Sequence, residues 1–146
     1  MSDANPAARA LPPRWMPIGD EPELCSAGEW WDAVRAVEAV GQRAIEILGE
    51  GDEPVGPVIL DQEGPEPRMY FLVPVGTAVR WEEPGTVALG QTCHVLVPAA
   101  ESTTPPGAHW HVFPKGPRAL TRAEALRRAL SQARRERRGP AEDSAS

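Results

Sequence analysis

Seventeen prolines and thirteen glycines in a chain of 146 residues limit what this sequence can build. Proline fixes its own φ and has no amide hydrogen, and both residue types interrupt helices and strands. We therefore expect short regular elements separated by firm turns. At this length the chain should form one domain around one hydrophobic core.

Two segments show the periodicity of amphipathic helices. Apolar residues recur at three- and four-residue spacing over residues 29–48, which predicts an N-terminal helix. Gly41 lies in its apolar stripe, where a close approach to a sheet would explain the missing side chain. Thr121 and Glu124 have the spacing of a capping box, which predicts the start of a C-terminal helix whose apolar stripe ends at Ala133.

Five short runs are typical of strands, because they combine β-branched and aromatic residues with turn signals on either side. The runs are residues 56–61, 67–74, 86–90, 93–98 and 109–114. The first two predict an antiparallel hairpin, and the next two predict a second pair. Strands of this kind flanked by helices predict an α+β fold: a small antiparallel sheet of about five strands, with the N-terminal helix packed on it and a basic C-terminal helix.

The two ends of the chain differ in composition from the middle, because they are rich in Ala, Pro, Ser and Asp and poor in large apolar residues. We expect a disordered N-terminus over residues 1–13 and a single α+β domain over residues 14–133. Residues 134–146 should form a frayed basic helix end and a disordered tail.

No apolar run approaches the roughly 18–20 residues of a membrane span, and no secretory signal pattern opens the chain. Cys25 and Cys93 are the only cysteines, and free thiols are the expectation for such a pair in a reducing compartment. We expect a cytoplasmic protein without membrane contact and without a cofactor.

The net charge of −6 is unevenly distributed. Residues 115–138 contain nine of the fifteen basic residues and two acids, so this segment carries about +7 and the rest of the chain about −13. An acidic body argues against a broad nucleic-acid surface, whereas the basic helix could bind phosphate, nucleic acid or an acidic protein partner. The alternative is a solvated helix end without a specific role. The candidate contacts are Arg127, Arg128, Arg134, Arg135, Arg137 and Arg138.

The three histidines form the sharpest local cluster. His109 and His111 are two apart on a predicted strand and should face the same way, so with Cys93 or His94 of a neighbouring strand they could hold a metal ion. The alternative is that the histidines line a solvent face while Trp110 packs inward. The spacing lacks the C-x-x-C pattern of structural zinc sites, so we predict no metal and treat the three histidines and Trp110 as candidate binding residues.

Other patterns for catalysis are weak. Asp61 and Glu63 form a D-x-E pair after a strand, but the glycine and prolines that follow are typical of a solvated hairpin turn. The segment GEGDEPVG places acids where a phosphate would sit. Ser102 and the two threonines after it lack the pattern of a nucleophile elbow.

Two stretches carry a resemblance to a known family. They are YFLVPVG (residues 70–76) and TVALGQTCHVLVPAAESTTPPGAHWHVFP (residues 86–114). Together they resemble the later half of the bifunctional DNA primase/polymerase N-terminal domain, a member of the archaeo-eukaryotic primase superfamily. That domain reads there as a Y-F strand ending in Pro, a strand ending in Val-x-Pro-Pro, a Ser/Pro/Gly loop and an aromatic strand. The chain is also similar to a set of small actinobacterial proteins that open with W-D-A-V-R and end with H-W-x-V-P.

The resemblance implies a primase/polymerase-like fold, but the catalytic positions of that family are not matched. Its metal-binding acids would lie upstream of the hairpin, where this chain has few residues. Its essential His would fall at Arg68 or Met69, and its later Asp within residues 86–88. Nucleotidyl transfer requires carboxylates that hold two metal ions. We therefore expect a non-catalytic binding or regulatory module that contacts nucleic acid through the Arg-rich helix. The alternative is a small metal-binding protein or enzyme that uses His109 and His111.

Overall fold

The computed structural model describes residues 14–115 and 119–145, with side chains up to Arg137. The elements in chain order are β1 (Glu23–Ser26), β2 (Asp32–Val37), α2 (Glu38–Glu50), β3 (Val58–Asp61), β4 (Arg68–Val73), the 3₁₀ turn η1 (Ala78–Arg80), β5 (Val87–Leu89), β6 (His94–Val97), β7 (His109–Val112) and α3 (Ala123–Ala145). The N-terminal segment 1–13, predicted to be disordered, lies outside the described residues. Within the described part, no helix is long and apolar enough to cross a lipid bilayer.

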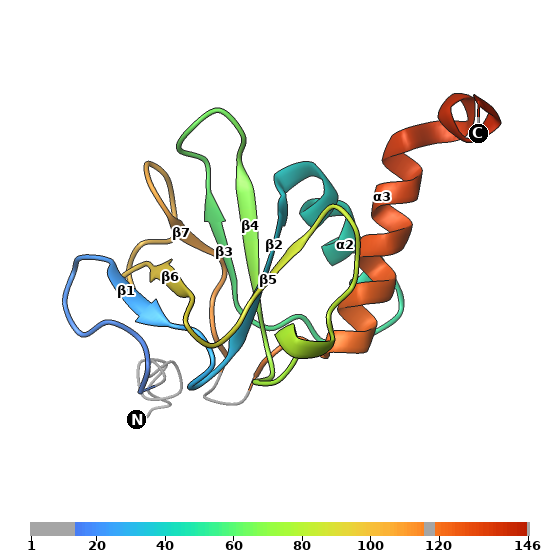
Figure 1. The fold of residues 1–146 in the computed structure, drawn as a ribbon. Helices are drawn as coiled ribbons and strands as arrows, with labels where there is room; N and C mark the ends of the chain where they lie inside the picture. Colours follow the sequence, from blue (N-terminus) through green and yellow to red (C-terminus); the bar gives the residue numbers. More distant parts are fainter. Residues whose placement is uncertain (1–13, 116–118, 146) are drawn as a thin grey trace.

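The predicted α+β class is confirmed. Five strands form an antiparallel sheet in the order β5-β2-β4-β3-β7, and β1 and β6 form a separate antiparallel pair. Helices α2 and α3 pack on one face of the five-stranded sheet, and the two-stranded sheet packs on the other face (Figure 1). The predicted hairpin of β3 and β4 is also confirmed. The large sheet is therefore the middle of three layers.

Alternation along the strands divides the hydrophobic core into two parts. Val34 and Phe71 face the helices, whereas their neighbours Ala33 and Leu72 face the small sheet, and all four are fully buried. This is the two-residue period expected of strands covered on both faces. An aromatic cluster fills the small-sheet side, and its members are Trp15, Trp31, Trp110 and Phe113.

The predicted helix over residues 29–48 is wrong in its first half. Residues 32–37 form β2, which pairs with β4 on one side and with β5 on the other, and the helix begins only at Glu38. The sequence DAVRAV has apolar residues on both faces of a strand, so its pattern fits either period. Two ladders of backbone hydrogen bonds decide in favour of the strand.

The predicted pairing of residues 86–90 with residues 93–98 is also wrong. Both segments contain strands, but β5 pairs with β2 of the large sheet and β6 pairs with β1 of the small sheet. A tight turn, in which the Cys93 amide donates to the Gly90 carbonyl at 3.0 Å, carries the chain from one layer to the other. Strand β1, the partner of β6, was not predicted.

Thr121 does not cap α3 as the sequence suggested. Its side chain is fully buried, and its hydroxyl oxygen accepts the Gly56 amide at 2.8 Å, which ties the segment before α3 to the segment before β3. The backbone of α3 is helical to Ala145, past Ala133, where we expected fraying. The predicted domain limits otherwise remain predictions.

Gly41 allows α2 to lie close to the sheet, as the sequence suggested. A Cβ atom at this position would lie 2.6 Å from the sulfur of Met69, which is fully buried on β4. Gly49, in the last turn of the same helix, has no atom within 4 Å of such a Cβ.

We predict opposite effects for alanine at these two helical glycines. Gly49→Ala should raise the free energy of unfolding by about 0.5–1 kcal/mol, because alanine favours helix. Gly41→Ala should be less stable than Gly49→Ala by about 1–3 kcal/mol, because Met69 must move within a packed core. Urea unfolding of both variants measures the difference. Equal stability would contradict the close packing of α2 on β4.

Candidate functional site

A groove lies between the two sheets, on the face of the large sheet opposite the helices. It encloses about 150 Å³, and we call it the inter-sheet groove. Its lining residues are Arg35, Ile59, Asp61, Tyr70, Leu89, His94, Val95, Leu96 and Ala108. At roughly 30 Å³ per water molecule, the groove has room for one small chemical group of a ligand, while the rest of that ligand would lie outside the groove. Apolar walls with a few converging polar groups are typical of binding sites.

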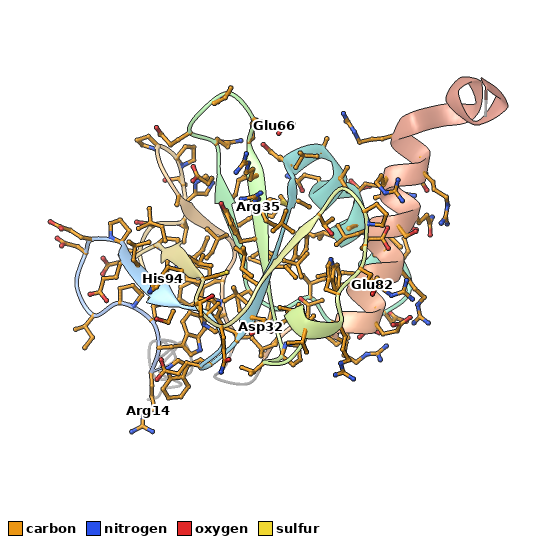
Figure 2. The ribbon with its side chains drawn as sticks, in the orientation of Figure 1. Arg14, Asp32, Arg35, Glu66, Glu82 and His94 are labelled. Atoms are coloured by element: carbon orange, nitrogen blue, oxygen red, sulfur yellow. The ribbon has the colours of Figure 1, made fainter. Side chains whose placement is uncertain are left out.

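Strand register places the polar residues of the groove. Arg35 on β2 lies directly opposite Tyr70 on β4, and Tyr70 lies opposite Ile59 on β3. Asp61 is two residues after Ile59, so it faces the same side of the sheet. Figure 2 shows Arg35 on the large sheet and His94 on the small sheet. Arg35 was not predicted as a site residue because residues 32–37 were interpreted as helix; the two-residue alternation of a strand over DAVRAV would have placed Arg35 on a face of the sheet.

Arg35 is half-buried and has no acidic partner among residues 14–115 and 119–137. None of the ion pairs among the described residues includes Arg35 or its diagonal neighbour Arg68, and neither side chain donates a hydrogen bond to a described residue. A second hollow of about 110 Å³ borders both arginines. Asp61 is the single carboxylate of the groove, and its Oδ1 accepts the Glu63 amide at 3.0 Å. The groove therefore contains one guanidinium, that of Arg35, that can bind an anionic group, whereas Arg68 lines only the second hollow, together with Glu66.

His94 is the predicted binding residue that lines the groove. It is exposed on the outer face of the small sheet, where its Nε2 lies 3.3 Å from the Ser26 hydroxyl on β1. Cys93 precedes it and packs on the opposite side, in the core between the sheets. The two neighbours therefore cannot act on one ligand.

The other predicted residues of this cluster are not brought together. The pairing of β7 with β3 shifts by one residue, because Val112 and Trp110 lie opposite the adjacent residues Val58 and Ile59. His111 is the extra residue of this bulge. The bulge interrupts the regular alternation on which the expected shared face of His109 and His111 was based, and the charge of His109 still acts on His111.

Each of these side chains has a separate environment. His109 is 5% exposed, and its Nδ1 lies 2.9 Å from the Gly107 carbonyl. Trp110 is buried in the aromatic cluster, and His111 is exposed. Partial burial lowers the pKa of His111, with Glu38 opposing this shift and His109 adding to it. Within residues 14–115 and 119–145, no three His, Cys, Asp or Glu side chains are grouped so that they could hold a metal ion.

Several arginines of α3 bind the acidic body of the same molecule. Glu83, which precedes β5 and is buried, lies 3.9 Å from an Nη of Arg127 and 3.5 Å from an Nη of Arg134. Arg127 also pairs with Glu124 at 2.6 Å, and this hydrogen bond lowers the pKa of Glu124. Arg135 donates to the Ser131 hydroxyl. Two of the predicted phosphate contacts are therefore used inside the fold.

Two further ion pairs hold α3 in place. Arg43 of α2 pairs with Glu136 at 2.7 Å, and Arg122 pairs with Glu53 at 2.8 Å. The hydrogen bonds from these arginines lower the pKa of Glu136 and of Glu53. Of the remaining predicted contacts, Arg128 and Arg137 are exposed, and the side chain of Arg138 lies outside the described residues.

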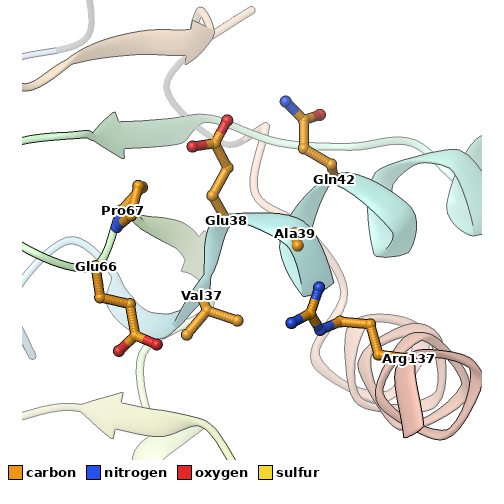
Figure 3. Close-up of a pocket in the computed structure, with 7 residues that line it drawn as sticks. All are labelled: Val37, Glu38, Ala39, Gln42, Glu66, Pro67 and Arg137. Atoms are coloured by element: carbon orange, nitrogen blue, oxygen red, sulfur yellow. The ribbon is translucent and has the colours of Figure 1, made fainter.

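A larger hollow of about 380 Å³ lies where β2 passes into α2 (Figure 3). Glu38, Gln42 and Glu66 form its polar walls, and Arg137 extends toward it from α3. The amide of Gln62 already donates to the Glu38 carboxylate at 3.1 Å, and Glu66 and Arg137 are exposed. Glu38 is therefore paired, and Glu66 and Arg137 are open to solvent. The inter-sheet groove differs because its charged group Arg35 is half-buried and has no partner among the described residues.

Asp32 is a buried carboxylate with a structural role. It is 3% exposed, and its Oδ2 accepts the amides of Gly76 at 3.0 Å and Ala78 at 2.9 Å. These bonds fix the loop between β4 and η1 on the end of β2 (Figure 2). Because the oxygen is already used by two donors, we assign Asp32 to the fold and not to the site.

Comparison with known proteins gave no relative for this chain, because no family model, no curated protein and no solved structure matches it. The geometry of the described residues therefore carries the functional argument.

We predict that Asp32→Ala lowers the free energy of unfolding by about 1–3 kcal/mol, because two amides lose their acceptor in a buried setting. Asp32→Asn keeps an oxygen at the same place and should lose less. Urea unfolding monitored by tryptophan fluorescence measures both variants. A loss below about 0.5 kcal/mol for Asp32→Ala would contradict the role assigned to this carboxylate.

We predict that Glu83→Gln loosens α3 and releases Arg127 and Arg134. The variant should melt at a lower temperature and elute from heparin at higher salt than the wild type, because released arginines can bind polyanions. Glu82→Gln is the matched control, since Glu82 is exposed and the change in charge is identical. Identical melting and elution of the two variants would show that Glu83 does not restrain these arginines.

Proposed function

We propose that this protein is a non-catalytic binding module whose ligand places an anionic group beside Arg35 in the inter-sheet groove. The observation that carries the proposal is the contrast between arginines. Arg43, Arg122, Arg127 and Arg134 all pair with acids of the same chain, whereas Arg35 pairs with none among the described residues. The Arg35 guanidinium is half-buried but still reached by solvent, so it is free to bind a ligand, and a carboxylate or phosphate supplies a charge-assisted hydrogen bond.

The other walls of the groove limit what the ligand is. Tyr70 offers an aromatic edge and a hydroxyl, and His94 can donate or accept a hydrogen bond. Asp61 is the one carboxylate among the lining residues, and a single carboxylate cannot hold the two metal ions that nucleotidyl transfer uses. In this proposal the chain is a relative of the primase/polymerase domain that keeps a sheet-based binding face without the catalytic carboxylates.

Contact with nucleic acid through α3 is a secondary proposal. It is supported by the exposure of Arg128, Arg135 and Arg137 on the helix. These side chains can neutralise few phosphates, so the affinity would be weak and strongly dependent on salt.

We predict that N-acetylglutamate or adenosine monophosphate, titrated separately into ¹⁵N-labelled protein, shifts the amide signals of groove residues such as Tyr70 and Ala108. Arg35→Met should weaken binding by about tenfold to a hundredfold, because a hydrogen bond between charged groups is lost. Arg80→Met, on the exposed end of η1, is the matched control and should bind as the wild type does. If neither compound shifts these signals, or if Arg35→Met binds normally, the groove is not the binding site.

A further inference from the structure

The pairing of β1 with β6 determines which backbone groups of β6 are free. In this antiparallel pair Leu24 lies opposite Leu96 and Ser26 lies opposite His94. The Ala27 amide donates to the Cys93 carbonyl at 2.9 Å, so Ala27 and Cys93 are a hydrogen-bonded pair, and this pair determines which of the following pairs are hydrogen-bonded. In an antiparallel ladder, hydrogen-bonded residue pairs alternate with pairs that are not hydrogen-bonded. The N–H and C=O groups of the latter point away from the partner strand. His94 and Leu96 therefore present their backbone groups at the edge of β6 that faces away from β1.

That edge borders the inter-sheet groove. His94 and Leu96 line the groove together with Arg35 and Tyr70 of the large sheet. None of the backbone hydrogen bonds of turns and loops among the described residues uses the amide or carbonyl of either residue. The other sheet edges are less suitable, because β5 has three residues and β7 is interrupted by the bulge at His111. An unpaired edge beside a polar groove fits a polypeptide backbone, which carries the same groups at the same spacing.

We propose that the ligand is an extended peptide that adds to the small sheet as a third strand beside β6 and inserts an acidic side chain toward Arg35. This inference rests on the proposed function of the groove. Asp61 accepts the Glu63 amide, whereas Arg35 makes no ion pair or hydrogen bond with a described residue, so Arg35 is the charged group of the groove that is free to bind a ligand. A carboxylate of the peptide would form an ion pair with Arg35.

The outer face of the small sheet indicates which residues flank the acid. Leu24 is 69% exposed and Leu96 is 42% exposed, and the two lie directly opposite each other. A third strand would continue this row with its own outward side chain, and apolar neighbours across strands stabilise a sheet. Side chains of a strand alternate between its two faces. The peptide therefore has an acid between two apolar β-branched residues.

The probe is the peptide acetyl-Thr-Val-Glu-Val-Thr-amide, titrated into ¹⁵N-labelled protein and followed by amide shifts and their concentration dependence. Leu96→Pro removes the outward N–H of β6 without removing a bond to β1, because proline is tolerated at such edge positions. We expect this variant to weaken binding by about tenfold. Leu24→Pro is the matched control: it makes the same change at the opposite edge of the sheet, and it should bind as the wild type does.

A second set of probes leaves the protein unchanged. The peptide with N-methylated valines cannot donate to β6, and the peptide with Lys in place of Glu cannot pair with Arg35. Both should bind at least about tenfold more weakly than the parent peptide. These probes also decide the question if Leu96→Pro fails to fold.

The outcomes separate this inference from the proposed function. If N-acetylglutamate binds with dependence on Arg35, but N-methylation and Leu96→Pro leave peptide binding unchanged, strand addition is wrong and the groove remains a binding site. If adenosine monophosphate binds in the groove and the peptide does not, strand addition is likewise overturned, and the ligand is a nucleotide. If no probe shifts the groove residues, both proposals fail.

Discussion

The ladder between β2 and β4 is the constraint on which the other features depend. Its register runs from Asp32 opposite Val73 to Val37 opposite Arg68, without interruption. It holds residues 32–37 as a strand, so that α2 has to begin at Glu38 and lie back across the sheet. The same register places Asp32 under the loop after β4 and Arg35 beside Tyr70. A shift by one residue would turn Arg35 toward the helices and bury a charge in the main core.

Part of this fold follows from local sequence patterns. The hairpin of β3 and β4 was predicted because each strand is a short apolar run bounded by Gly and Pro, and Gly41 was correctly expected to face a sheet. These features depend on contacts close in sequence or on the absence of a side chain. The strand β2 was missed because its apolar residues occupy both faces, and partners more than thirty residues away decide its structure. The partners of β5 and β6 were missed for the same reason. Residues 90–93 carry the chain from the large sheet to the small sheet, and the hydrophobic periodicity of the sequence does not show this crossing.

The candidate site was predictable to a smaller extent. His94 was selected from the sequence and lines the groove, but the reason given, a strand adjacent to that of His109 and His111, was wrong because β6 pairs with β1 and β7 pairs with β3. Neither this pairing nor the bulge at His111 is visible in one strand alone. The Arg-rich helix was correctly recognised as basic, but its partners Glu83, Glu53 and Arg43 lie far away in sequence. Three of the nine basic residues over residues 115–138, Arg122, Arg127 and Arg134, pair with acids of the same molecule.

Helix α3 follows every strand in the chain, and this order has a consequence for synthesis. Its apolar residues, among them Leu126 and Leu130, form a large part of the core on the helix side of the sheet. During translation every strand is made before this helix, so Phe71, Met69 and their neighbours lack part of their cover until residues 125–133 have been added. Uncovered strands of this kind associate with other chains. The helix side of the core is therefore complete only after α3 has docked on the sheet.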